Sequence, residues 1–218
     1  MKKKIFVVAL AACLLILSVA GSSMAYFTDI EDATNTFTVG NVDIKLSEIN
    51  PENGQLTEIV NPITGFEYEN IYPTQVIPKQ PTITNVSSTN DSVYTAAKIT
   101  LTNASDLLAD EAAVKAFLAG GALNTDGFAS AKYVIDTTSK TITVYAIINA
   151  PLAKDASVDI FTNVVIPGTW DNDQMATFGT MKITINAYAT QTAGFTDATT
   201  AITTAFADNG WGTYNQLP

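Results

Sequence analysis

Hydrophobic and polar residues alternate along several segments of the chain, which is the pattern of strands with one face in a core. Residues 42–46 and 141–148 show it most clearly, because Val42, Ile44 and Leu46 alternate with polar neighbours and a second alternating run begins beside Ile142. Other segments rich in threonine and valine are bounded by turn-forming residues. We expect further strands at residues 82–86, 93–101, 132–135, 158–165 and 181–189, and a hairpin turn at residues 136–140.

Two segments have a helical pattern instead. Residues 106–118 follow a candidate N-cap, Ser105, carry acidic residues near their start and stop at Gly120 and Gly121. Residues 196–207 are rich in alanine and threonine and predict a short helix. The whole pattern predicts an all-β fold, a jelly-roll-like β-sandwich with one or two short helical insertions.

The start of the chain has the three parts of a secretion signal. Lysines at residues 2–4 precede a nearly unbroken apolar run at 5–20, and the small residues Ser23 and Ala25 occupy the positions that a signal peptidase reads. We therefore expect a cleavable signal helix over residues 1–25, cut between Ala25 and Tyr26. Contact with the membrane would be through this helix alone, before cleavage.

Two other interpretations of the first segment stay open. The apolar run approaches the roughly 20 residues that span a bilayer, so a retained anchor is one alternative. Residues 10–13 also fit a bacterial lipobox, in which Cys13 would be lipidated. That cut would place four apolar residues at the front of the mature chain, where a polar surface spacer is expected, so we favour the cut after Ala25.

The segment after the cut is a candidate for pairing with another sheet. We divide the mature chain into residues 26–40 and a single β-sandwich domain over residues 41–218. The first part is mostly compatible with β-structure and can add to an open sheet edge. The apolar residues near the end of this part have odd numbers, whereas those of the strand at residues 42–46 have even numbers. Because alternate residues of a strand point to opposite faces, the face that points inward changes between the two segments. A β-bulge or a crossing between sheets produces such a change. The candidate assembly strand contains Tyr26, Phe27, Ile30, Phe37 and Val39, and the hinge is Gly40 with Asn41.

Composition restricts what the exported part can do. Removing residues 1–25 leaves 193 residues and changes the net charge from −10 to −13, because the only charges removed are three lysines. The chain has no arginine and no histidine, which argues against nucleic acid as a partner. The single cysteine, Cys13, leaves with the signal, so the mature protein has no disulfide and no thiol nucleophile. Its stability has to come from a packed core.

No catalytic or cofactor-binding residue is predicted. Without histidine there is no His-Glu-x-x-His zinc motif and no base for a serine or cysteine triad. Residues 125–127 read Thr-Asp-Gly and not the Asp-Thr-Gly of an aspartic protease. A glycosidase needs only two carboxylates, so the 21 acidic residues leave that route open.

Two groups of residues are candidates for weak binding, one of calcium and the other of sugar. Carboxylates near residues 106–111 and 171–173 could offer oxygen atoms to extracellular calcium, but neither group has the spacing of an EF-hand. An acidic first helical turn and a solvated turn are the favoured interpretations. Aromatic residues on strands usually pack in a core, which we favour over a sugar-binding platform. The residues concerned are Asp106, Asp110, Glu111, Asp171, Asn172 and Asp173 for calcium, and Tyr145, Trp170, Tyr188, Phe195 and Trp211 for sugar.

Several segments carry a resemblance to a known family. Residues 25–29 read Ala-Tyr-Phe-Thr-Asp and residues 35–44 read Asn-Thr-Phe-Thr-Val-Gly-Asn-Val-Asp-Ile. They resemble the start of the TasA/camelysin family of exported bacterial surface and biofilm-matrix proteins. Residues 161–167 and 182–195 resemble the last strands of that family, and residues 78–85 resemble a segment of its clostridial-type relatives. Residues 101–154 have no segment that we can match.

The resemblance implies a jelly-roll fold, export through a dedicated signal peptidase and, for fibre-forming members, assembly in which the N-terminal segment of one subunit completes the sheet of the next. The expected partners are copies of the chain or a related matrix subunit. We therefore expect a secreted structural protein of the cell surface or extracellular matrix. A monomeric surface-binding module, with residues 26–39 folded back as an edge strand, is the alternative. Camelysin has also been described as a metalloendopeptidase, but the lack of histidine argues against that activity here.

Overall fold

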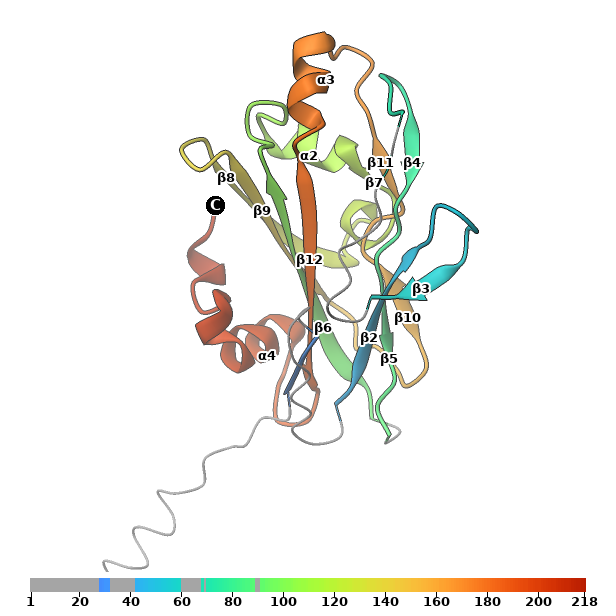
Figure 1. Ribbon diagram of the computed structural model, residues 1–218. Helices are drawn as coiled ribbons and strands as arrows, with labels where there is room; N and C mark the ends of the chain where they lie inside the picture. The colour runs from blue at the N-terminus through green and yellow to red at the C-terminus, as the bar shows by residue number, and fades with distance from the viewer. Residues whose placement is uncertain (1–27, 32–41, 60–67, 69, 89–90) are drawn as a thin grey trace, which may run out of the picture.

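The structure is a computed structural model, and it describes residues 28–31, 42–59, 68, 70–88 and 91–218. Its strands form three antiparallel sheets arranged in two layers, and short helices lie at one end and on one outer face (Figure 1). The predicted all-β sandwich is therefore confirmed.

The largest sheet has five strands in the order β1-β12-β6-β9-β8. The predicted hairpin joins its last two strands, and Asp136 organises the turn between them. The hydroxyl of Ser139 and the backbone amides of Ser139 and Thr138 donate hydrogen bonds to this carboxylate, which holds the pKa of Asp136 below its ordinary value. The strands are β1 (Thr28–Glu31), β6 (Val93–Thr102), β8 (Ala129–Asp136), β9 (Thr141–Ile148) and β12 (Lys182–Gln191).

Two smaller sheets form the second layer, in the orders β10-β5-β2-β3 and β4-β11-β7. The single strand predicted at residues 158–165 is wrong, because the chain changes partner there. The amide of Ile160 donates to the Pro81 carbonyl at 2.9 Å, and the amide of Thr162 donates to the Ala119 carbonyl at 2.9 Å. The strands are β2 (Ile44–Ile49), β3 (Leu56–Glu58), β5 (Thr82–Asn85), β10 (Ser157–Asp159), β4 (Val76–Pro78), β7 (Leu118–Ala119) and β11 (Asn163–Val165).

The main core lies between the two layers. The even-numbered residues of β9 from Ile142 to Ile148 are buried in it, as the alternation predicted. Ile147, on the opposite face, is nevertheless 0% exposed, so β9 is not a half-buried strand along its whole length. The reason is that the carboxyl-terminal helices cover the outer face of the five-stranded sheet (Figure 1).

The first described helix begins later than predicted. α2 (Glu111–Phe117) is capped by Asp110, whose carboxylate accepts the amide of Ala113 at 2.8 Å, and not by Ser105. The preceding residues form a turn that buries Leu108. Gly121 follows the helix at φ +64, and a Cβ there would lie 2.7 Å from the Cα of Phe161, so only glycine fits.

Two more helices follow in the described chain. α3 (Asn172–Phe178) was predicted as a turn, but Asp171 and Gln174 form a capping box that starts a helix there. α4 (Ala198–Ala205) lies inside the segment predicted at residues 196–207 and is capped by Asp197. The short helices η2 (Ala207–Asn209) and η3 (Tyr214–Gln216) complete the carboxyl-terminal part, and η1 (Ala122–Asn124) follows α2. The described residues thus contain three α-helices, more than the one or two predicted.

Candidate assembly interface

The N-terminal strand lies at one edge of the five-stranded sheet. β1 pairs with β12 of its own chain in antiparallel register, with Thr28 opposite Thr190 and Ile30 opposite Tyr188. β1 therefore belongs to one layer, and β2 belongs to the other. Of the predicted assembly strand, only Ile30 falls within the described backbone. The other predicted residues lie outside the described residues. They are Ala25 and Tyr26 at the cleavage site, Phe27, Phe37 and Val39 of the assembly strand, and Gly40 and Asn41 of the hinge.

β12 presents a well-buried edge to β1. Its other edge pairs with β6 along its full length, from Lys182 opposite Thr102 to Gln191 opposite Val93. Ala187 and Ala189 belong to the core between the layers, whereas Tyr188 packs in a second cluster on the outer face. A strand that pairs with residues 187–190 is consequently added to a sheet that has apolar cover on both faces.

The outer cover is made by residues 195–217, which we call the C-terminal layer. It contains α4, η2 and η3, and Figure 1 places it on the face of the five-stranded sheet that lies away from β2, β5 and β10. Tyr188 stacks edge-on against Phe206 and Trp211, with ring centroids 5.1 and 5.5 Å apart. Burial in the same layer raises the pKa of Tyr214 to about 12. The layer is therefore held by an aromatic core of its own.

The five aromatic residues considered as a sugar platform do not form one surface. Trp170 is 7% exposed and packs with Phe117 and Phe178 in the main core, whereas Trp211 is 0% exposed on the other face of the sheet. Tyr188 is buried, and Tyr145 and Phe195 are partly buried against the outer cluster. Their arrangement is that of packing residues.

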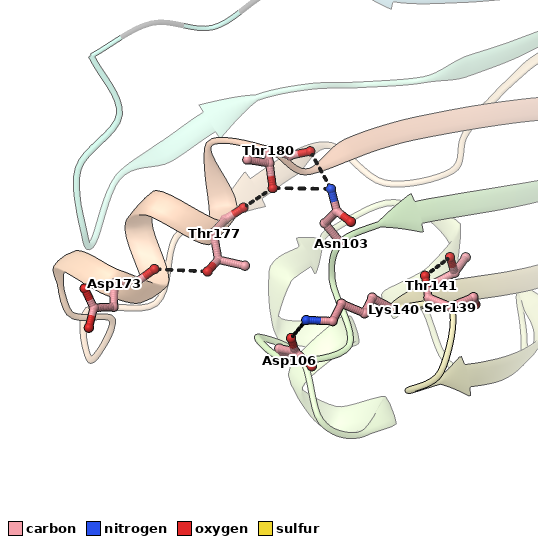
Figure 2. Close-up of polar contacts among 8 residues, drawn as sticks. All are labelled: Asn103, Asp106, Ser139, Lys140, Thr141, Asp173, Thr177 and Thr180. Atoms are coloured by element: carbon pink, nitrogen blue, oxygen red, sulfur yellow. Dashed lines mark hydrogen bonds and ion pairs between the residues drawn. The ribbon is translucent and has the colours of Figure 1, made fainter.

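The carboxylates considered for calcium serve other contacts at one end of the sandwich. Figure 2 shows Asp106 turned toward Lys140, with Nζ and Oδ2 2.7 Å apart, while Asp173 lies on α3, on a different part of the chain. Asn103 joins the two parts by donating to the carbonyl and hydroxyl oxygens of Thr180 (Figure 2). Asp110 and Asp171 are helix caps, and Glu111 pairs with Lys115.

No group of three or more His, Cys, Asp or Glu side chains that could hold a metal is present in the described part of the chain. Calcium binding by single carboxylates stays a prediction. The same residues include no helix long and apolar enough to cross a membrane.

An ion pair that the sequence did not predict lies inside the protein. Lys79 Nζ is 2.6 Å from Glu48 Oε2, and the two side chains are only 9% and 8% exposed. Glu48 lies on β2 and Lys79 directly follows β4, so the pair connects the two smaller sheets. Burial, and secondarily the charge of Glu48, raise the pKa of nearby Tyr68 to about 12.

Comparison with known proteins gives one match. A family model described as camelysin metallo-endopeptidase matches residues 1–115, which is more than half of the chain. No curated protein and no solved structure matches. The matched part contains β1 to β6 and most of α2, whereas β12 and the C-terminal layer follow it.

Proposed function

The chain belongs to the camelysin family, and on that premise we propose that it is a secreted structural subunit that assembles by exchanging its N-terminal strand between copies. Membership in this family supports, at the level of the family, an extracellular or surface protein. We further propose that a dedicated signal peptidase cuts the chain between Ala25 and Tyr26. The mature protein would then lie in the extracellular matrix or at the cell surface, with copies of the chain or a related subunit as its partners.

The pairing of β1 with β12 of the same chain is the folded-back arrangement, and it also defines the backbone groups that an exchange between copies would use. Four residues of β1 form the pairing, whereas β2 lies in the other layer. The same four residues of a second copy offer the same backbone groups in the same register. Exchange would therefore replace one set of hydrogen bonds with an identical set, which makes strand exchange a low-cost route to assembly. Because each copy donates one strand and accepts one, such contacts can continue into a fibre.

A pair of introduced cysteines distinguishes exchange from folding back. Directly opposed residues of antiparallel strands have Cβ atoms about 4.5–5.5 Å apart, close to the spacing of a disulfide. In the mature chain with Thr28→Cys and Thr190→Cys, no other cysteine is present after cleavage. We expect oxidised assemblies to give a ladder of covalent multimers on non-reducing gels. A cross-linked monomer as the only product from assembled material would contradict exchange.

A matched control places the second cysteine at the opposite edge of the same sheet. Ser130 lies on β8, which is separated from β1 by β12, β6 and β9. The combination of Thr28→Cys and Ser130→Cys should therefore give neither a multimer ladder nor a cross-linked monomer. This control removes random collision between exposed thiols as an explanation of the ladder.

We propose that the role is not enzymatic, although the family is named for a metallo-endopeptidase. Peptidase zinc sites normally combine histidine with a carboxylate, and the chain contains no histidine. The mature protein, purified without chelator, is expected to leave casein intact. Hydrolysis that disappears after dialysis against EDTA would show the opposite and would support the peptidase alternative.

A further inference from the structure

The C-terminal layer extends across the five-stranded sheet from the β12 side to β8. At β8 the hydroxyl of Tyr214 donates to the Ser130 carbonyl at 2.8 Å, and Lys132 Nζ donates to the Leu217 carbonyl at 2.7 Å. Near the β1 edge, Phe206 and Trp211 pack on Tyr188 of β12. The layer is thus attached at both sides of the sheet and reaches the strand that pairs with β1.

The register of β1 places two of its positions on the same face of the sheet as this layer. Directly opposed residues in an antiparallel pair share one face of the sheet. Position 30 stands opposite Tyr188, whose ring is in the outer cluster, and position 28 stands opposite Thr190. Positions 29 and 31 stand opposite Ala189 and Ala187, which face the main core.

Thr190 adds an independent observation at the same place. Its side chain is 0% exposed, and its hydroxyl has no hydrogen-bond partner among the residues that the structure describes. A buried hydroxyl without a partner is costly, so a group that formed a hydrogen bond with it would stabilise this position. The position directly opposite is residue 28, at the start of β1.

We infer that the C-terminal layer is one wall of the acceptor site for the N-terminal strand, with residues 28–31 of a second copy as the occupant in the assembled protein. Backbone hydrogen bonds from β12 supply affinity for any extended segment. The C-terminal layer on one face and the main core on the other determine which residues fit at alternate positions of that segment. Without the layer, one face of the added strand would be in water. Docking of the strand and docking of the layer therefore stabilise each other. The inference depends on the proposed function only for which molecule donates the strand.

The two tryptophans of the mature chain provide a matched test. Trp211 belongs to the layer, and Trp170 is buried in the main core beside α3. Each is replaced with alanine in the full mature chain carrying Thr28→Cys and Thr190→Cys, and the rate of cross-linking under a glutathione redox buffer is measured. We expect Trp211→Ala to slow cross-linking about tenfold relative to Trp170→Ala. Equal rates, with the C-terminal layer of the Trp211 variant (residues 195–217) newly sensitive to protease, would overturn the inference.

A milder pair of variants covers the case in which Trp211→Ala does not fold. Tyr214→Phe removes the hydrogen bond to Ser130, whereas Tyr133→Phe removes a buried hydroxyl that has no partner among the described residues. Only Tyr214→Phe should slow the reaction, by a few-fold. Equal rates for this pair would also contradict the inference.

The cross-linked product separates this inference from the proposed function. If intact protein gives only cross-linked monomer, exchange between copies fails. The comparison of rates still tests whether the layer forms a wall of the site.

Discussion

Replacing Glu48 with glutamine is expected to lower the free energy of unfolding by about 3–5 kcal/mol. The substitution leaves the Lys79 ammonium buried without the carboxylate that lies 2.6 Å away. A buried charge that has lost its partner keeps its desolvation cost and gains nothing in return. Urea unfolding of the intact protein and the variant, followed by circular dichroism, measures the difference.

A second ion pair on the same strand is the control. Lys45 of β2 and Glu58 of β3 are 2.8 Å apart, but their side chains are 47% and 35% exposed. Water and salt screen such a pair, so Glu58→Gln should cost less than about 1 kcal/mol. Replacing both buried partners, Glu48→Leu with Lys79→Met, should restore most of the lost stability. A Glu48→Gln cost no larger than that of Glu58→Gln would show that the buried pair is not a structural link.

The strands could largely be predicted because the alternation of hydrophobic and polar residues is a property of each short segment alone. β9 begins and ends at the predicted residues, and the turn at Asp136 is explained by side chains within three positions of it. Burial on both faces of the five-stranded sheet was not predictable in this way, since Ile147 is covered by a segment more than fifty residues later. The Lys79–Glu48 pair joins residues 31 positions apart and leaves no periodic signal.

The errors in the helices have local causes. Asp171 followed by Gln174 three positions later is the spacing of a capping box, so α3 carried a signal that the interpretation as an acidic turn overlooked. For α2, Ser105 and Asp110 are both acceptable caps by residue type, and the choice depended on Leu108 being buried in the preceding turn. For the candidate site, β12 was predicted as a strand, but its role as the partner of β1 depends on a pairing that sequence parity does not specify.

Deleting residues 26–36 from the mature chain is expected to abolish filaments and leave a folded, soluble monomer. The deletion removes β1, which is the strand to be donated, but leaves β12 and the C-terminal layer in place. The mature protein is first shown by N-terminal sequencing to begin at Tyr26. Electron microscopy and size-exclusion chromatography of both proteins at the same concentration then measure assembly. Unchanged filaments would contradict strand exchange, and an intact protein that stays monomeric at high concentration would favour the surface-binding module.

The same deletion variant gives a second result that a misfolded protein would not. It can accept a strand from a neighbour through β12 but cannot donate one, so it should stop a filament at the end where it binds. Adding it at a small fraction to the intact protein is therefore expected to shorten the filaments in proportion to the amount added. In a head-to-tail assembly each contact joins two different surfaces, and loss of one surface blocks growth in one direction only. A variant that also carries Trp211→Ala should shorten filaments less, because it lacks part of the wall against which the donated strand packs.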